Sequence, residues 1–300
     1  MSAHGIDADQ VAGGCFCCRF SDLIDAAEHL RAHAPDVIFA EAAGSCTDIS
    51  ATTLQPLKLH HADQFRVAPY TVLVDPQRAL DLRAANAPAD LVFLFEKQTE
   101  EADLLCFSKA ELNAEFPPLR GAPVRYLSAI TGQGVAEWLD EILAEDVPSG
   151  NRILEIDYQR YARAEAALAW LNCRVSVRLA VPLAPAQLIG PLLEYFDRAL
   201  TSAGFLIAHL KLTGDSPSGF LKASLVRNGG EPSVQGMFDA SPTETHELVV
   251  NVRAAGDPEL LEAIVRAAIE DLGQVEWTTM QCFRPAPPTP QYRIASVVNI

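Results

Sequence analysis

Three cysteines stand within four residues near the start of the chain, where residues 13–18 read Gly-Gly-Cys-Phe-Cys-Cys. A thiolate is a soft ligand that binds zinc or Cu(I) far better than oxygen ligands do. The two glycines let the backbone fold tightly, so that Cys15, Cys17 and Cys18 can reach one ion. Free cysteines are also common as small buried hydrophobic residues. A core requires no such density of sulfur, and the cluster therefore favours a metal site.

The remaining cysteines and histidines give weaker signals. Cys46 follows a glycine-serine pair and fits either a fourth metal ligand or a buried structural thiol. His60 and His61 are adjacent, so they point in different directions from most backbones and are predicted to be loop residues. Three others lie in or beside apolar segments and are predicted to serve packing: Cys106, Cys173 and His209.

Composition bounds the class of protein. The chain has 300 residues, 49% of them hydrophobic, which is enough for two domains with full cores. A formal charge of −16 counts against nucleic acid or an anionic membrane surface as the main partner. No apolar run approaches the roughly 18 residues of a membrane span, and the first residues lack the features of a signal peptide. Seven cysteines, an odd number, do not resemble a secreted disulfide framework. We expect a reduced, cytoplasmic protein.

Short apolar segments alternate with helical periodicity over the first half of the chain. A helix is expected after Ser21, a possible N-cap, with Leu23, Ile24 and Leu30 on one face. Strands are expected at residues 37–40, 70–74, 104–107 and 124–127, and further helices at 48–57, around 96–101 and at 135–143. Short apolar strands that alternate with helices predict an α/β domain with a mostly parallel sheet.

A turn-rich link at residues 146–150 is the expected domain boundary, which gives domains at 1–147 and 151–300. Beyond it, helices are expected at 158–171, 185–200 and 258–272, and strands at 174–181, 205–212, 220–226 and 248–252. This order predicts a smaller α+β domain with its helices on one face of an antiparallel sheet.

Polar residues follow the expected strands of the first domain, where open α/β sheets bind ligands. Residues 41–44 (Glu-Ala-Ala-Gly) come after the first strand, 108–111 (Ser-Lys-Ala-Glu) after the third, and 128–129 (Ser-Ala) after the fourth. An acid followed by a glycine in E-x-x-G can serve magnesium and a γ-phosphate, because the glycine amide approaches the phosphate closely. Each element alone is compatible with simple turn chemistry. Their order is the informative part.

That order resembles the CobW-type family of P-loop GTPases, which act as metal chaperones or metal-insertion factors. The resemblance covers roughly the first half of the chain and rests on residues 14–18, Asp22-Leu23, 41–44, 103–111 and 128–129. It implies that Cys15, Cys17 and Cys18 are ligands of Zn²⁺ or a related thiophilic ion. It further implies GTP and Mg²⁺ as ligands of the sheet. The implied nucleotide-binding residues are Glu41 and Gly44 beside magnesium and the γ-phosphate, Ser108, Lys109 and Glu111 facing guanine, and Ser128 and Ala129 behind the base.

The P-loop signature G-x-x-x-x-G-K-[ST] is not found in this sequence, because none of the lysines follows a glycine. In the family that loop lies upstream of the cysteines. Three explanations are considered: an internal start of a longer protein, a paralogue that has discarded nucleotide chemistry, or a P-loop supplied by another chain. We favour the first, because a sheet without an early central strand would expose unpaired edges. Without a phosphate cradle, GTP hydrolysis is not predicted for this chain alone.

The guanine-reading motif of the family, Asn-Lys-x-Asp, stands here as Ser108-Lys109-Ala110-Glu111. A serine hydroxyl is shorter and less well directed than an asparagine amide, and glutamate places its carboxylate one methylene further out. Loss of one buried hydrogen bond typically costs about 1 to 3 kcal/mol. We therefore expect weakened guanine selectivity, with a partly decayed site as the alternative.

The sequence predicts a zinc-binding, CobW-like protein of a GTP-switched metal delivery or insertion system. A second hypothesis is a nucleotide-independent metal-binding regulatory module that works through protein contacts, and a third is a thiol redox protein. The expected partners are a metal ion and a client metalloprotein, with neither nucleic acid nor membrane. A homo-oligomer is compatible with the sequence, which does not specify it.

Overall fold

The structure is a computed structural model that describes residues 6–11, 14–85, 87–112, 115–145 and 147–299. Gly13 of the cysteine segment and Asp146 of the expected link lie outside the described residues. The chain divides into two compact units, residues 1–164 together with 287–300, and residues 165–286. The last fourteen residues therefore belong to the first unit, and the division falls within a helix rather than at the link.

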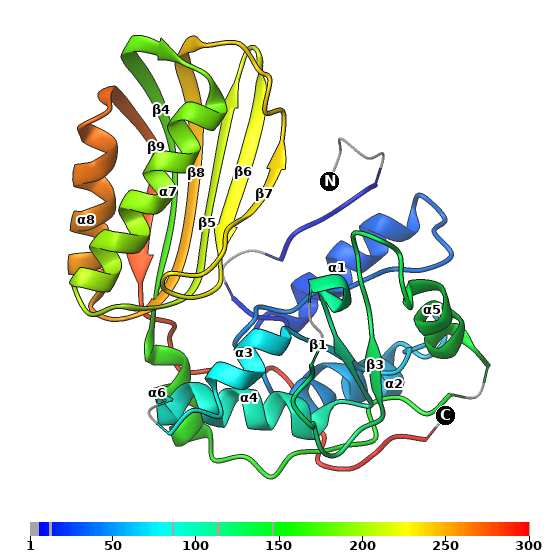
Figure 1. The fold of residues 1–300 in the computed structure, drawn as a ribbon. Coiled ribbons are helices and arrows are strands. Elements are labelled where there is room, and N and C mark those ends of the chain that lie inside the picture. The colour runs from blue at the N-terminus through cyan, green and yellow to red at the C-terminus, as the bar shows by residue number, and fades with distance from the viewer. Residues whose placement is uncertain (1–5, 12–13, 86, 113–114, 146, 300) are drawn as a thin grey trace. The chain divides into compact units, whose positions relative to one another are not determined.

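The first unit is built on a three-stranded parallel sheet in the order β1-β2-β3 (Figure 1). Its strands are β1 (Thr71–Val74), β2 (Leu104–Phe107) and β3 (Val124–Tyr126). In the register, Thr71 pairs with Leu104 and Leu105 pairs with Val124. The central strand β2 is buried along its whole length, as strands covered on both faces are. The predicted α/β fold with a parallel sheet is confirmed.

Alternate residues of β2 point to opposite faces of the sheet, and each face has its own core. Leu105 and Phe107 pack in a cluster with Val74, whereas Leu104 and Cys106 pack with Leu127 and Ile142 of α5. The helical elements of this unit are α1 (Phe20–Arg31), a π-helix (Ser50–Leu54), α2 (Gln55–His60), α3 (Pro76–Asp81), α4 (Ala89–Glu101), a 3₁₀ turn (Ala110–Leu112), α5 (Val135–Leu143) and α6 (Tyr158–Ala166), which crosses into the second unit.

The expected strand at residues 37–40 was wrong. This segment has no regular secondary structure, and Phe39 is 66% exposed. An apolar run becomes a strand only where a neighbouring strand accepts and donates its backbone hydrogen bonds. In the described residues, the parallel sheet holds β1, β2 and β3 alone. Apolar composition was therefore insufficient to assign this strand.

The turn after β3 needs a glycine. Gly134 is the N-cap of α5 with φ of +70°, in the left-handed region that glycine adopts readily. A side chain at this position would also collide with the Tyr126 carbonyl. The helix that follows buries Ile142 against β2, so this turn fixes the residues that come after β3.

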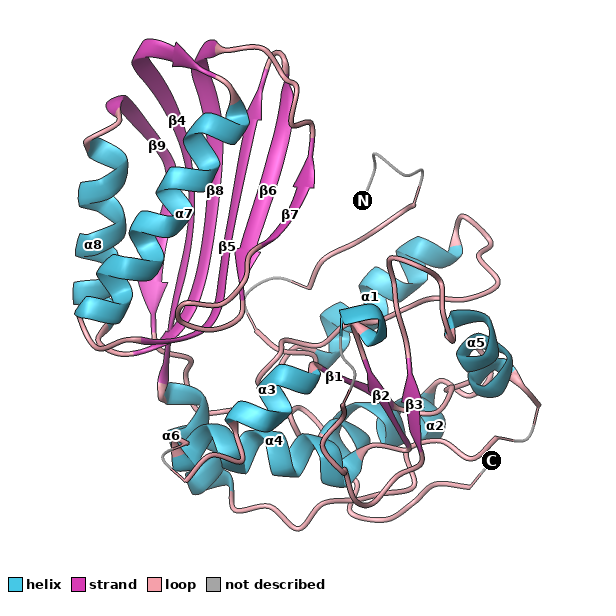
Figure 2. Cartoon of the chain, in the orientation of Figure 1, coloured by secondary structure: helices cyan, strands magenta, loops and turns pink. Residues whose placement is uncertain are grey.

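The second unit is a six-stranded antiparallel sheet in the order β7-β6-β5-β8-β4-β9. Its strands are β4 (Leu168–Leu183), β5 (Leu206–Ser216), β6 (Gly219–Leu225), β7 (Ser233–Gly236), β8 (Thr243–Ala255) and β9 (Gly273–Phe283). Helices α7 (Pro185–Ser202) and α8 (Pro258–Glu270) cover one face of the sheet (Figure 2). The predicted α+β architecture is confirmed for this unit.

Several element boundaries in the second half differ from the prediction. The helix expected at 158–171 ends at Ala166, because the chain from Leu168 onward pairs with β8. Strands β7 and β9 were not predicted, and β9 carries many exposed polar residues because it is an edge strand. Within the described residues, no helix is both long and apolar enough to cross a membrane.

Candidate metal centre

The three cysteines lie on a tight turn that leads directly into α1. The backbone N–H groups of Cys18 and Arg19 both donate to the Cys15 carbonyl, at 3.1 and 3.0 Å. Phe20, the first residue of α1, is buried in a cluster with Leu23 and Ile24, and Phe16 packs against it. The helix begins one residue before the predicted cap Ser21. Phe16 and Phe20 thus anchor the turn, and the side chains of the three cysteines lie close to one another.

The three sulfur atoms lie within 4.8 Å of one another. Cys15 Sγ is 2.8 Å from Cys17 Sγ and 3.3 Å from Cys18 Sγ, and the last two are 3.7 Å apart. A tetrahedral zinc ion with bonds of about 2.3 Å would hold its sulfur ligands about 3.8 Å apart. The separation of Cys17 and Cys18 already fits, and Cys15 would have to move outward by about 1 Å. The residues present fit a thiophilic ion.

Neighbouring groups favour a thiolate at one end of the cluster. A hydrogen bond from the Cys17 thiol lowers the pKa of Cys15 well below its ordinary value. The same hydrogen bond and burial raise the pKa of Cys17, whose side chain is 1% exposed. The turn also stands at the N-terminus of α1, where the helix dipole stabilises negative charge. The cluster can therefore hold one negative charge before any ion binds.

The C-terminal segment of the chain contacts this turn, which sequence reasoning did not predict. Thr289 donates its backbone N–H to Cys18 Sγ at 3.2 Å, and Gln291 donates its own to the Cys17 carbonyl at 2.9 Å. The Gln291 side chain accepts from the Ser21 N–H at 2.8 Å. Backbone N–H groups that donate to sulfur commonly orient thiolate ligands. No local pattern around residue 289 signals this contact.

The predicted guanine-facing residues gather at the carboxyl ends of β2 and β3. The Ser108 N–H donates to the Val74 carbonyl at 2.9 Å, and the Ala110 N–H donates to the Leu127 carbonyl at 3.0 Å. Ser128 is fully buried, whereas Ala129 is exposed.

Lys109 and Glu111 differ in their partners. Lys109, with φ of +55°, forms an ion pair with Asp75 in which Nζ lies 2.6 Å from Oδ2. Glu111 Oε2 is buried and accepts no hydrogen bond from the described residues. A buried carboxylate oxygen without a donor is costly unless a ligand or water supplies one. This oxygen can accept from a bound group.

Glu41 and Gly44 lie on a separate exposed segment without regular secondary structure. Gln98 of α4 holds the end of this segment, since its Nε2 donates to the carbonyls of both Gly44 and Cys46 at 2.9 Å. Gln98 was placed on a helix by the sequence, but its contact with this segment was not predicted.

Two buried carboxylates, Asp48 and Glu101, lie at the residues that follow this segment. Asp48 is 1% exposed, accepts from the Tyr158 hydroxyl at 2.6 Å and pairs with Arg293 at 2.8 Å. Glu101 accepts from the Thr47 hydroxyl at 3.1 Å and from the Ser50 N–H at 3.2 Å, and burial raises its pKa to about 8. These contacts fix the start of the helical stretch from residue 50 onward. No local pattern in the sequence predicts them.

The other candidate ligands lie elsewhere. His60 and His61 make aromatic contacts with Tyr292 and Phe20. Cys106 and Cys173 are buried in β2 and β4, and burial lowers the pKa of His209 on β5 to about 4. Among the described residues, Cys15, Cys17 and Cys18 form the one group of His, Cys, Asp or Glu side chains positioned to share a metal ion.

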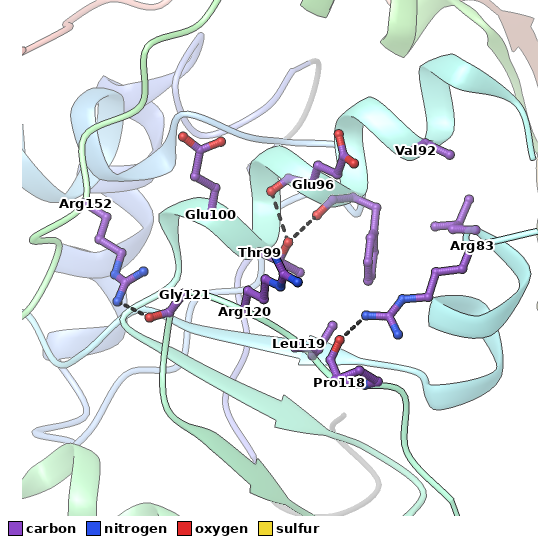
Figure 3. A pocket seen from close by; sticks show the side chains of 12 residues that line it. Arg83, Val92, Glu96, Thr99, Glu100, Pro118, Leu119, Arg120, Gly121 and Arg152 are labelled. Atoms are coloured by element: carbon purple, nitrogen blue, oxygen red, sulfur yellow. Dashed lines mark hydrogen bonds between the residues drawn. The ribbon is translucent and has the colours of Figure 1, made fainter.

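A cavity of about 570 Å³ lies between α4 and the segment that precedes β3 (Figure 3). Arg83 donates to the Pro118 carbonyl, and Arg152 donates to the Gly121 carbonyl at 2.6 Å. Glu96 and Glu100 also line the cavity. Because residues 118–121 precede β3, the cavity lies away from the strand ends that carry the predicted site residues.

These features define an α/β unit with a parallel sheet and a candidate thiolate metal centre. Residues 1–118 match the family model for the CobW/HypB/UreG nucleotide-binding domain, in agreement with the resemblance that the sequence predicted. No curated protein matches the chain significantly.

Two solved structures of the YjiA GTPase resemble the chain weakly. A Zn(II)-bound triple mutant is 14% identical over 85% of this chain and 78% of its own, with a TM-score of 0.27. The Zn(II)-bound protein from E. coli is 14% identical over 74% of this chain and 66% of its own, with a TM-score of 0.24. At this identity and TM-score, neither resemblance bears on the site residues.

Proposed function

We propose that this chain binds zinc, or a similar thiophilic ion, through Cys15, Cys17 and Cys18, and serves in a GTP-switched metal delivery or insertion system. The observation that carries the proposal is the approach of three sulfur atoms to within 4.8 Å of one another. The family of residues 1–118 supports the link to a nucleotide. We infer a cytoplasmic location because seven cysteines, an odd number with three clustered together, do not resemble a secreted disulfide framework.

The chain's own residues would hold the ion by charge and by orientation. The α1 N-terminus stabilises the negative charge of the thiolates, and the Thr289 N–H fixes the lone pairs of Cys18. Partial burial of the turn limits competition from water. The bound ion would cross-link the turn. A client protein with similar ligands could then take over the ion by ligand exchange.

The nucleotide part of the proposal rests on fewer contacts. Ser108, Lys109 and Glu111 would face the base, with Ser128 and Ala129 behind it, and the free Glu111 Oε2 would accept from ring N–H groups. Glu41 and Gly44 would lie toward the phosphates. Lys109 would first have to leave Asp75. We therefore expect weak GTP binding at most, and no hydrolysis is assigned to this chain alone.

Two alternatives have specific support. A nucleotide-independent metal-binding module is favoured by the ion pair that occupies Lys109. A redox role is favoured by Cys15 and Cys18, which stand in C-x-x-C spacing with their sulfurs 3.3 Å apart. Retention of one metal ion per chain under reducing conditions would exclude the redox role as the main function.

Calorimetric titration of the reduced chain with zinc and with GTP tests the proposal, alongside a Cys15→Ala/Cys17→Ala/Cys18→Ala variant. We expect one tight zinc ion per chain, lost in the variant, and weak or no GTP binding. Absence of specific zinc binding in the unmodified chain would overturn the metal proposal. Zinc binding without any GTP binding would favour the nucleotide-independent module.

A further inference from the structure

In the second unit, all of whose residues are described, one face of the sheet carries no helix. Helices α7 and α8 pack on the face whose side chains form the hydrophobic core (Figure 2). Along β4, β5, β6 and β8, buried side chains alternate with partly or wholly exposed ones, which belong to the opposite, open face. Antiparallel sheets commonly leave one face to solvent, so exposure alone assigns no role to the open face.

Basic side chains gather on the open face from four adjacent strands. Arg253 of β8 pairs with His209 of β5 in the register, and Lys211 lies two positions further along β5. Lys222 of β6 pairs with Thr213, two positions beyond Lys211. Burial and the positive charges of three neighbours in this group lower the pKa of His209 to about 4. The basic face, as we name this group, consists of Arg174, His209, Lys211, Lys222 and Arg253.

The open face separates charges by sign. Three rows of paired residues cross the sheet through Arg253, Asn251 and Val249 of β8, and these rows hold no aspartate or glutamate. Hydroxyl and amide side chains lie between the basic ones. The carboxylates Asp215 and Glu247 pair with each other in the next row, towards one end of the strands. In a chain with a formal charge of −16, the basic face is a local reversal of sign.

The aromatic ring beside the basic face already has a partner. The Arg253 guanidinium lies 4.0 Å from the centre of the Trp170 ring, and its Nη1 donates to Asn172 Oδ1 at 3.2 Å. Sheets that bind single-stranded nucleic acid stack bases on exposed aromatic rings. Because Arg253 covers the Trp170 ring, the open face is poorly suited to base stacking. A protein segment needs no such ring, only cations and hydrogen-bonding groups.

We propose that the basic face binds an extended, acidic segment of a partner protein. Neighbouring strands lie about 4.8 Å apart, so the four strands that supply the basic face span about 14 Å. An extended chain advances about 3.3 Å per residue, so a run of about five residues crosses this distance. Its carboxylates would meet the cations, which gives the complex its charge complementarity. The inference goes beyond the proposed function and does not require metal binding, because the cysteine turn lies in the other unit.

Fluorescence anisotropy of a labelled peptide tests the inference with the full, reduced chain. An Asp-Ser repeat is a suitable probe, since alternate residues of an extended chain point to one side. We expect binding that weakens as the salt concentration rises, and no binding of a matched Asn-Ser repeat. Failure of the chain to bind the Asp-Ser peptide, or equal binding of both peptides, would overturn the inference.

Charge reversal locates the binding site. Lys222→Glu should weaken peptide binding about tenfold, because it replaces an attraction by a repulsion. Arg198→Glu makes the same change of charge on an exposed residue of α7, which packs on the other face of the sheet. It should change the affinity by less than about twofold. Equal losses in the two variants would show that general charge, rather than the basic face, attracts the peptide.

A neutral substitution guards against misfolding. Lys222→Gln keeps a long polar side chain and should weaken peptide binding about threefold, with an unfolding midpoint in urea equal to that of the unmodified chain. Single-stranded RNA and vesicles that contain phosphatidylserine test other anions. Tighter binding of either one than of the peptide, at the same salt concentration, would overturn the assignment to a protein segment.

His209 reports contact at the basic face directly. A carboxylate bound beside its ring would stabilise the protonated form, so the pKa of His209 should rise from about 4 in the peptide complex. NMR titration of the ring protons measures this change, and an unchanged pKa of His209 would contradict binding at this face. The Cys15→Ala/Cys17→Ala/Cys18→Ala variant should bind the peptide as the unmodified chain does. Loss of zinc binding and loss of peptide binding are therefore separate outcomes.

Discussion

The backbone N–H of Thr289 donates to Cys18 Sγ at 3.2 Å and thereby joins the cysteine turn to the C-terminal segment. The same segment continues along the first unit, where Arg293 pairs with Asp48 and the Val298 N–H donates to the Gln55 side chain. The candidate metal centre is thus assembled from residues near both ends of the chain. A local sequence motif supplies its ligands, and distant backbone supplies their support.

Thr289→Pro should weaken metal binding although it removes no ligand. Proline lacks the N–H that donates to Cys18, and loss of such an outer contact typically costs about 10-fold to 100-fold in affinity. Competitive zinc titration with a chelator measures the change. Thr289→Ala keeps the N–H and removes only an exposed side chain, so its affinity should be unchanged. Equal affinity in both variants would show that this hydrogen bond does not support the site.

Arg293→Ala should destabilise the first unit because it removes the cation paired with buried Asp48. Arg293 is 32% exposed, so we expect a loss of about 2 kcal/mol, less than for a fully buried pair. Urea unfolding measures the change. In an Asp48→Asn background, where no charge is buried, the same substitution should cost much less. Strictly additive effects in this double-mutant cycle would contradict the coupling.

Glu101 should make stability fall as the pH rises. Burial raises its pKa from 4.5 to about 8, so in this window the folded state binds more protons than the unfolded state. The free energy of unfolding therefore decreases between these two pH values. Glu101→Gln keeps the hydrogen-bond acceptor and should remove this dependence. Unfolding midpoints measured across the window test it.

A neighbouring glutamate provides the control for that measurement. Glu100 is exposed and pairs with Lys97 on the same helix. Glu100→Gln should therefore retain the pH dependence of the unmodified chain. If Glu101→Gln and Glu100→Gln gave the same curve, the dependence would have to come from another group.

Asp75 should contribute to stability mainly as a helix cap. Its Oδ1 accepts from the N–H groups of Gln77 and Arg78 at the start of α3, and its Oδ2 pairs with Lys109. Asp75→Ala should cost about 1 kcal/mol through loss of the cap. Asp75→Asn keeps an acceptor and loses a partly exposed ion pair, which is worth about 0 to 1 kcal/mol. Equal losses in urea unfolding would assign the effect to the ion pair instead.

Local patterns predicted much of this fold. Four apolar residues bounded by polar ones gave β2, helical periodicity gave α5 at residues 135–143, and the order of strands and helices gave the parallel sheet. The cysteine triad was equally local, because three ligands within four residues need only a tight turn to meet. Such features depend on neighbours in the sequence, and the sequence is sufficient for them.

Only the tertiary structure decided which distant segments meet. Residues 37–40 are as apolar as β2, yet they form no strand, since a strand requires a hydrogen-bonding partner that composition does not reveal. Thr289 reaches Cys18 across 271 positions of sequence. Long-range contacts like these are set by the packing of whole elements. The cysteine ligands could therefore be predicted from the sequence, whereas the residues that surround them could not.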